Sequence, residues 1–413
     1  MNSKRSTLSR RDFLRSAFIT TGAAILAACA GAPAAQPTPV PEPTKAPEPT
    51  KVPEPTQAPE PTATTSTGSS QTDQELATKI DTVMGKLDKA GMLSGALLLA
   101  HNGNVILSKG YGLADRENKI PNTPTTRFRI ASITKGFTAM AILMLQEEGK
   151  LSVDDPVCKY IPECPASWQA VKINHLLTHT AGVCDCFNVL IVAVKGQATP
   201  VPSTSAQLIA RIEERPLDFA PGAKFSYSSG GYVVAGYVVE QVSGQPYEQF
   251  LQEHIFGPLG MKNTGYARDD SGLAVGYQNS LARGDRVDGS LPFAAGGLYS
   301  TVEDLYLYTQ ALDGNRPLSQ KSMEALFGKH IQCDEDGGFG SDYQLPVYYG
   351  YGWAIASYNG HREIGHNAWL PGYSGDMRRF PDDKITMILL MNQEDPFATG
   401  LADQVVETIF KAK

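Results

Sequence analysis

Several common catalytic signatures are missing from this sequence of 413 residues. No G-x-S-x-G occurs, which excludes the nucleophile elbow of the α/β-hydrolases. No glycine-rich phosphate loop or dinucleotide fingerprint stands out either. His175 and His179 have the i, i+4 spacing of zinc ligands, but the intervening Leu-Leu-Thr lacks the glutamate of the zinc-peptidase helix. We therefore interpret both histidines as structural and expect no metal and no other cofactor.

The sequence is also poor in basic residues. Its 36 lysines and arginines face 43 aspartates and glutamates, a formal net charge of −7. Residues 1–29 carry five of the basic residues and one acidic residue, and without them 31 basic residues face 42 acidic ones, a net charge of −11. A nucleic-acid partner would require a basic surface, so the charge disfavours one.

The apolar stretch near the N-terminus, Ala17–Ala28, is too short to span a bilayer comfortably. It follows a basic region and ends in small residues, which is the pattern of an export signal. The segment Ser9-Arg10-Arg11-Asp12-Phe13-Leu14 resembles a twin-arginine signal, which implies export of a folded or nearly folded protein. Residues 1–29 are therefore expected to direct export.

The export signal ends in Leu26-Ala27-Ala28-Cys29, which resembles a bacterial lipobox. In a lipobox the cysteine thiol is acylated and the cysteine becomes the new N-terminus. The alternative is a buried cysteine in an ordinary signal peptide. We favour lipidation of Cys29, and expect an extracytoplasmic protein that is lipid-anchored to the bacterial cell membrane.

Five further cysteines follow, at positions 158, 164, 184, 186 and 333. Outside the cytosol they are expected to be oxidised rather than metal-bound. Cys158 and Cys164 bracket a short loop and are the favoured pair. Cys184 and Cys186 are expected not to bridge each other, and one of them is expected to reach Cys333, although the sequence alone leaves this connectivity open.

Residues 30–72 form a proline-rich segment in which Pro-Glu-Pro-Thr occurs four times, at 41–44, 47–50, 53–56 and 59–62. Such a composition cannot build a core, and proline at this density favours extended polyproline II. At about 3 Å per residue it could reach on the order of 100 Å. We interpret it as a disordered spacer between lipid and domain; recognition by a proline-binding partner is the alternative.

Residues 73–413 have the patterns of one large domain. Two strand-like runs, Gly95–His101 and Asn104–Gly112, flank Asn102-Gly103, a strong hairpin signal. The other expected strands are Tyr348–Ser357, His361–Gly365, Gly372–Phe380 and Ile385–Met391, and helical patterns cover 74–87, 132–148, 203–214, 230–243, 246–255, 302–312 and 397–411. Strands at both ends of a helix-rich middle predict an α/β protein of the α+β type. Its antiparallel sheet is assembled from both chain ends and flanked by helices, and the helix-rich middle forms a subdomain.

The residues with the clearest chemistry are Ser132 and Lys135, which open an apolar helix. Positions three apart share a helix face, so the serine hydroxyl and the lysine amine are expected side by side. Lys135 can accept the proton of Ser132 if burial lowers its pKa. Backbone N–H groups at the helix start would stabilise the negative charge that develops in acyl transfer.

The segments around this pair resemble the β-lactamase-related serine hydrolases, which include class C β-lactamases, DD-peptidases and family VIII esterases. The resemblance covers about residues 76–410 and rests on five segments that occur in the family's order: FRIASITK at 128–135, LSVDDPV at 151–157, INHLLTHTAG at 173–182, IFGPLGM at 255–261 and AGGLYST at 295–301. It implies the penicillin-binding-protein fold and a serine nucleophile that forms an acyl-enzyme.

The family's second motif, Tyr-x-Asn, corresponds to Tyr227-Ser228-Ser229. By resemblance, Tyr227 is the phenol that shuttles protons together with Lys135. Ser229 replaces the asparagine that binds substrate, and it lacks the reach and the paired donor and acceptor of an amide. This substitution weakens the case for a β-lactam or peptide side-chain amide as the bound group.

The third motif, Lys/His-x-Gly, corresponds to His366-Asn367-Ala368, followed by Trp369. The resemblance implies that His366 and Asn367 line the cleft and that the backbone N–H of Trp369 joins that of Ser132 in the oxyanion hole. A histidine here is similar to the peptidase and esterase branches, and is expected to be a weaker, pH-dependent cation than lysine. Arg378 and Arg379 are the other candidates for binding a substrate carboxylate, but neighbours on a strand face opposite ways, so at most one should face the cleft.

Together these residues predict a metal-free serine hydrolase that acts on a small ester, amide or D-amino-acid peptide. A true β-lactamase or a D-alanyl-D-alanine carboxypeptidase is an alternative, and a non-catalytic sensor of cell-wall fragments is an alternative of another class. A monomer is expected, with a small molecule or a peptide as substrate.

Overall fold

The computed structural model describes residues 70–185, 202–278, 282–283, 287–314, 317–333, 343–394 and 397–411. The predicted export signal, the lipidation site Cys29 and nearly all of the spacer lie outside the described residues. Within the described part of the chain, no helix is both long enough and apolar enough to cross a membrane.

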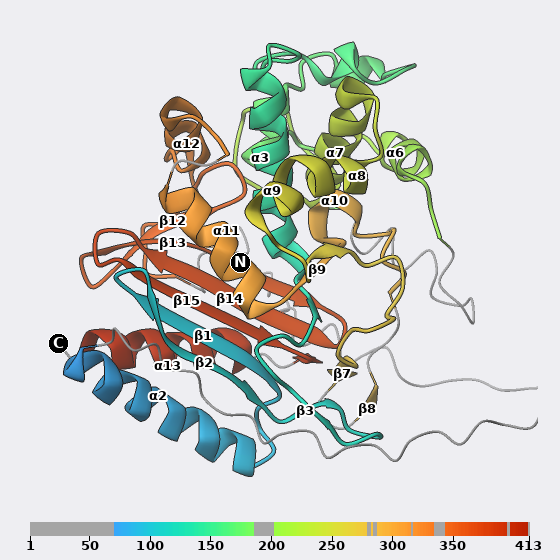
Figure 1. Ribbon diagram of the computed structural model, residues 1–413. Helices are drawn as coiled ribbons and strands as arrows, with labels where there is room; N and C mark the ends of the chain where they lie inside the picture. Colours follow the sequence, from blue (N-terminus) through green and yellow to red (C-terminus); the bar gives the residue numbers. More distant parts are fainter. Residues whose placement is uncertain are drawn as a thin grey trace, which may run out of the picture. The chain divides into compact units, whose positions relative to one another are not determined.

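An eight-stranded antiparallel sheet forms the centre of the fold (Figure 1). Its strands lie in the order β10 (Ile331–Gln332), β11 (Tyr348–Tyr349), β12 (Ala354–Tyr358), β13 (His361–Leu370), β14 (Tyr373–Phe380), β15 (Ile385–Met391), β1 (Gly95–His101) and β2 (Asn104–Tyr111). Strand β1 pairs with β15, so that Gly95 faces Met391 and His101 faces Ile385. The predicted sheet built from both chain ends is therefore confirmed.

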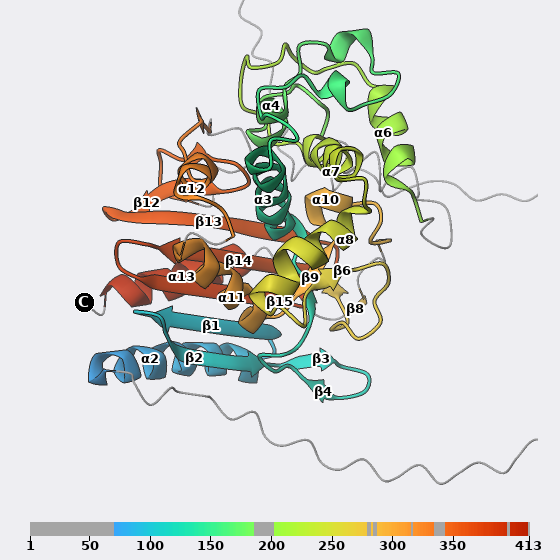
Figure 2. The same ribbon diagram turned by 45° about the horizontal axis from the view of Figure 1, so that its top comes forward.

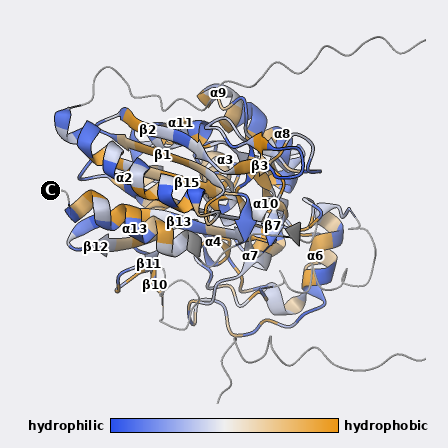
Figure 3. Ribbon diagram, turned by 90° about the horizontal axis from the view of Figure 1, so that it is seen from below, coloured by the Kyte–Doolittle hydropathy of each residue, from blue (hydrophilic) through white to orange (hydrophobic). Residues whose placement is uncertain are grey.

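Helices cover both faces of this sheet (Figure 2). Helices α2 (Gln71–Lys89) and α13 (Phe397–Lys411) pack on one face, against alternate strand residues such as Leu97, Leu99 and Met387. Helix α11 (Val302–Asp313) packs on the other face with the main core, which contains Leu98 and Ile388. Because successive side chains of a strand point to opposite faces of the sheet, the strands contribute apolar residues to two separate cores. Figure 3 shows apolar and polar residues along both α2 and α13, as expected of helices with one face on a sheet.

The middle of the chain is rich in helices, as predicted, and it packs above the α11 face of the sheet (Figure 2). Helix α3 (Thr134–Glu147) is buried along most of its length, and α7 (Ser229–Ser243) lies beside it. The other α-helices of the described residues are α4 (Ile173–Leu177), α6 (Ser205–Glu213), α8 (Tyr247–Leu251), α9 (Gly257–Leu259), α10 (Phe293–Gly296) and α12 (Gln320–Leu326). A π-helical segment covers Gln252–Phe256, and short 3-10 turns cover Ala131–Ile133, Val157–Lys159 and Ala166–Trp168. Small strands β3 (Leu113–Asp115), β4 (Ile120–Pro121), β5 (Phe128–Arg129), β6 (Gly265–Tyr266), β7 (Tyr277–Gln278), β8 (Ala282–Arg283), β9 (Leu298–Ser300) and β16 (Gln393–Glu394) complete the fold.

The first helix begins earlier than the sequence predicts, at Gln71 rather than near Gln74. Ser70 is its N-cap: the Ser70 hydroxyl accepts from the backbone N–H of Asp73, and the Asp73 carboxylate accepts from the backbone N–H of Ser70. This capping box satisfies two N–H groups that would otherwise lack partners. It therefore starts this helix at Gln71.

The strand expected at Tyr348–Ser357 is wrong as a single element, since β11 and β12 are separated by a turn. Gly352 in this turn has φ 79°, a left-handed conformation that glycine adopts without strain. A Cβ atom there would lie 2.7 Å from the backbone oxygen of Lys135. The turn therefore brings the sheet against the first turn of α3.

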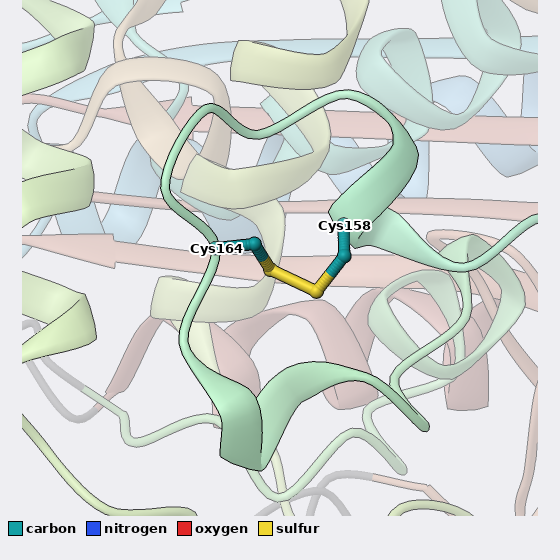
Figure 4. The surroundings of a disulfide bond; sticks show 2 residues. All are labelled: Cys158 and Cys164. Atoms are coloured by element: carbon teal, nitrogen blue, oxygen red, sulfur yellow. A yellow bond between two sulfur atoms is a disulfide. The ribbon is translucent and has the colours of Figure 1, made fainter.

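The predicted disulfide between Cys158 and Cys164 is present, with the Cα atoms 5.2 Å apart (Figure 4). The pairing of Cys184 or Cys186 with Cys333 is wrong, because Cys333 is a buried thiol. Cys184 is itself in a disulfide, whose partner lies outside the described residues. Cys333 instead contributes to a small apolar cluster that includes Phe225 and Tyr349, a placement that residue spacing does not indicate.

Candidate active site

Ser132 lies in the 3-10 turn that leads directly into α3. It is partly exposed, whereas its neighbours Ala131 and Ile133 are buried. Ala131 has φ 42°, an unfavourable conformation for a residue with a side chain. Backbone strain of this kind persists where the surrounding structure imposes it, and here it presents the serine hydroxyl at the surface of an otherwise buried helix start.

Lys135 lies one helical turn after Ser132 and is completely buried, with 0% of its surface exposed. Its Nζ donates to Ser132 Oγ at 3.1 Å and to the backbone oxygen of Ala295 at 2.8 Å. Burial lowers the pKa of Lys135 to about 7, and the carboxylate of Asp185 partly opposes this effect. Near neutral pH a large fraction of Lys135 is thus a neutral amine in contact with the serine hydroxyl.

Tyr227 approaches Ser132 from the chain segment that precedes α7. Its hydroxyl donates to Ser132 Oγ at 3.0 Å, and Lys135 Nζ lies 4.9 Å from the centre of its ring. Burial raises the pKa of Tyr227, and Asp185 raises it further, while the hydrogen bond with Ser132 lowers it. Tyr227 is therefore a neutral phenol near pH 7, and Lys135 is the better base of the two.

A buried histidine, His179, supports Tyr227. The two rings lie 4.3 Å apart between their centres, and His179 Nδ1 accepts from the backbone N–H of Ser228 at 3.0 Å. The Ser228 hydroxyl in turn caps α7 by accepting from the backbone N–H of Gly231, and it donates to the backbone oxygen of Cys184. The segment after α4 is thereby fastened to the start of α7, which fixes the position of Tyr227.

Ser229, which replaces the motif's asparagine, is the first residue of α7 and is 9% exposed. Its backbone N–H donates to Asp185 Oδ1 at 3.0 Å. Ser229 follows Tyr227 by two residues, and its backbone contact with Asp185 is one that the motif alone does not indicate.

His366 lies on β13, on the face that packs toward α3 and Tyr227. It is buried, and its ring centre lies 6.2 Å from that of Tyr227. Its Nδ1 lies 2.6 Å from the backbone oxygen of Asn367, which can only accept, so Nδ1 carries a proton. Its Nε2 lies 3.0 Å from the Tyr349 hydroxyl and accepts from it in the neutral ring.

The expectation that His366 is a weak cation is wrong. Burial lowers the pKa of His366 to about 3, and the nearby charge of Lys135 lowers it as well. The ring is therefore neutral at physiological pH. It is a buried, hydrogen-bonded side chain that links β13 to β11, and it supplies no positive charge for a substrate carboxylate.

Asn367 and Trp369 point to the opposite face of β13 from His366, since side chains alternate along a strand. Strand β12 begins at Ala354, opposite Gly365, so the last five residues of β13 extend beyond it. Trp369 is 49% exposed at this end, whereas Leu370 is buried in the main core. The 3-10 turn Ala131–Ile133 packs against β13, which is compatible with the predicted oxyanion role of the Trp369 N–H.

The two arginines on β14 face opposite sides of the sheet, as predicted, and both already bind carboxylates. Arg378 binds Asp376 through two hydrogen bonds of 2.9 Å and forms ion pairs with Glu363 and Asp403. Arg379 hydrogen-bonds Asp313 on α11. Their positive charges are thus engaged within the fold.

Sequence analysis missed three contributors to this site: Tyr349, Asp185 and the backbone of Ala295. His179, which it interpreted as structural, is buried and packs against Tyr227. His179 and Ala295 lie inside segments that carry the family resemblance, but their partners depend on how the chain folds. Tyr349 and Asp185 belong to no motif that we used, so only the structure shows where they lie.

The fold and the site together are those expected of a serine hydrolase, with Ser132 in the turn before α3 and the buried Lys135 one helical turn after it. The chain belongs to the β-lactamase family, whose family model matches residues 76–408. It is a serine hydrolase of that family, with the mixed α/β fold of penicillin-binding proteins.

Individual relatives agree with this assignment. The protein PbpX of Bacillus subtilis, described as a penicillin-binding protein, is 35% identical over 242 residues, which are 57% of this chain and 58% of that protein. The chain thus spans little more than half the length of that relative. The octameric penicillin-binding protein homologue of Pyrococcus abyssi has a TM-score of 0.71 and 29% identity over 81% of this chain and 77% of that one. The D-amino acid amidase of Ochrobactrum anthropi in complex with L-phenylalanine amide has a TM-score of 0.69 and 26% identity over 82% of this chain and 98% of that one.

Proposed function

We propose that this protein hydrolyses small esters and amides through an acyl-enzyme on Ser132. The observation that carries the proposal is the hydrogen-bonded group of Ser132, Lys135 and Tyr227, in which burial lowers the pKa of the lysine to about 7. A lysine with this pKa is a base matched to neutral pH.

The first half-reaction follows from this geometry. Ser132 Oγ attacks the substrate carbonyl carbon while its proton passes to the neutral amine of Lys135. Backbone N–H groups at Ser132 and Trp369 are proposed to hold the oxyanion. The bond to the leaving alcohol or amine then breaks, and the leaving group takes the proton from Lys135 by way of the Tyr227 hydroxyl. The product is an ester between the acyl group and Ser132.

The second half-reaction uses the same groups with water. A water molecule attacks the acyl carbonyl carbon, and its proton passes to the pair formed by Lys135 and Tyr227. The bond to Ser132 Oγ breaks, Oγ takes the proton back, and the carboxylic acid leaves.

Three features favour small esters and amides over β-lactams. His366 is neutral, and both Arg378 and Arg379 are engaged by carboxylates, so none of these three offers a cation for the β-lactam carboxylate. Ser229 is a poor substitute for the asparagine that binds a side-chain amide. A buried polar group of the substrate that finds no partner costs about 1–3 kcal/mol.

The test is a panel of a chromogenic short-chain ester, a chromogenic cephalosporin and a D-Ala-D-Ala peptide. The kcat/KM for the ester should exceed that for the cephalosporin by at least about tenfold, or about 1.4 kcal/mol. Ser132→Ala should abolish all turnover in a folded protein, whereas Ser271→Ala, in an exposed loop, should retain it. A Ser229→Asn variant should reduce the difference in kcat/KM between the ester and the cephalosporin. Faster hydrolysis of the cephalosporin than of the ester would contradict the preference and favour a β-lactamase.

We propose further that the protein is exported, is attached to the outer face of the bacterial membrane by a lipid on Cys29, and acts as a monomer. The basic, apolar and lipobox pattern of residues 1–29 supports the anchor. The Pyrococcus abyssi relative is octameric, so light scattering of the purified domain is the direct measurement of the oligomeric state.

A further inference from the structure

An exposed carboxylate lies beside the proposed reaction centre. Asp185 is exposed, and its Oδ1 accepts from the backbone N–H of Ser229 at 3.0 Å. Ser229 opens α7 only two residues after Tyr227, whose hydroxyl contacts the nucleophile. The first turn of α7 therefore holds the Asp185 carboxylate at the rim of the site.

The charge of Asp185 acts on both proton-transfer groups. It raises the pKa of Lys135 against the effect of burial, and it adds to the raised pKa of Tyr227. This effect agrees with the hydrogen bond that holds Asp185 at the start of α7, two residues after Tyr227, because Coulomb interactions weaken with distance and with solvent screening.

No comparable cation opposes this carboxylate among the described residues that line the site. Lys135 is buried behind Ser132, and His366 is neutral. Arg378 and Arg379 bind carboxylates elsewhere in the fold. Among the described residues the rim of the site therefore carries a negative charge, the opposite of what a substrate with a carboxylate beside the scissile bond requires.

We propose that Asp185 selects acyl donors that carry an ammonium group next to the scissile carbonyl, namely amides and esters of amino acids with a free α-amino group. This inference rests on the proposed hydrolysis at Ser132 and names its substrate class. The ammonium offers three donors, and a charge-assisted hydrogen bond to a carboxylate is stronger than one between neutral groups. The same carboxylate repels anionic substrates, so it favours cationic substrates and disfavours anionic ones.

The test compares two substrates that differ in one charge, D-alanine p-nitroanilide and its N-acetyl derivative. For the unmodified enzyme at pH 7, kcat/KM should be at least tenfold higher for the free amine. In Asp185→Asn the amide oxygen can still accept from the Ser229 N–H, but the charge is gone, and the ratio of the two kcat/KM values should fall at least tenfold. The ratio cancels changes in the pKa of Lys135, because both substrates use the same base.

The matched control is Asp269→Asn. Asp269 is also exposed and accepts a backbone N–H, that of Ser271 at 2.8 Å, but it lies outside the site. This variant should keep the ratio of the unmodified enzyme. Two outcomes would overturn the role of Asp185 alone, provided that cleavage still depends on Ser132. In one, kcat/KM is no higher for the free amine than for the N-acetyl substrate. In the other, the ratio of the two kcat/KM values stays the same in Asp185→Asn. Absence of Ser132-dependent cleavage of either substrate would overturn the proposed function as well.

Discussion

Lys135 shows how a single buried side chain acquires its chemistry from its surroundings. In water a lysine amine is protonated up to a pKa of about 10.4. Here complete burial lowers its pKa to about 7, while hydrogen bonds to Ser132 and Ala295 hold the amine in place. The same residue on an exposed helix would be a cation at neutral pH and could not accept a proton.

This shift predicts how activity depends on pH. Below a pKa of about 7 the ammonium form of Lys135 prevails, so kcat/KM for a neutral ester should fall about tenfold per pH unit, and above it should reach a plateau. His366, with a pKa of about 3, adds no inflection between pH 5 and 9. The Lys135→Arg side chain carries a permanent charge, so kcat should fall about 10²–10⁴-fold. The remaining activity should no longer increase as the pH rises through 7. A profile that is flat through pH 7, or that rises only near pH 10, would contradict the assignment of Lys135 as the base.

At the scale of elements, the turn between β11 and β12 connects the sheet to the catalytic helix. Gly352 in this turn packs against the backbone of Lys135 and Gly136, and Trp353 packs against Gly136. A change in the turn should therefore reach the position of Lys135.

Two glycines of similar conformation allow this link to be tested. Gly352 and Gly360 both have positive φ, 79° and 89°, but a Cβ atom at Gly352 would lie 2.7 Å from the Lys135 oxygen, whereas one at Gly360 would meet nothing within 4 Å. Gly360→Ala should lower the free energy of unfolding by about 1–2 kcal/mol, because an alanine at positive φ is strained, and activity should be retained. Gly352→Ala should cost about 1–3 kcal/mol more and should lower kcat/KM. Urea unfolding and ester kinetics check both, and equal losses in the two variants would show that the contact with α3 is unimportant.

Elements with a long, regular pattern were predictable from the sequence, and contacts between distant elements were not. Helix 397–411 and strand Ile385–Met391 were predicted with the bounds that the structure has, because the apolar residues of the helix recur at the helical period and the strand is a short, nearly continuous apolar run that follows a turn. The proximity of Ser132 and Lys135 follows from helix geometry in the same way. The neutral state of His366 was not predictable, since it depends on burial and on the charge of Lys135, which lies on another element. The engagement of Arg379 by Asp313 was missed for the same reason.

For the molecule as a whole, the predicted lipid anchor is open to a direct experiment. Cys29→Ser should prevent lipid attachment, because a serine hydroxyl cannot replace the thiol as acyl acceptor. Labelling with a fatty-acid analogue and fractionation of membranes measure the effect, and an alteration of the buried thiol, Cys333→Ser, is the control that should keep its lipid. Unchanged labelling of Cys29→Ser would show that the lipobox interpretation is wrong.

The pairing of β1 with β15 also sets the order of events during biosynthesis. Gly95 and Met391 face each other on neighbouring interior strands of the sheet, although 295 residues lie between them. The ribosome must therefore complete almost the entire chain before this strand pair can form, and the nascent N-terminal hairpin stays without its neighbour until then. Contacts of such long sequence separation slow folding. A chain that ended before Ile385 would lose an interior strand and the C-terminal helix together, so truncation should separate the N-terminal hairpin from the rest of the sheet rather than shorten the sheet at its edge.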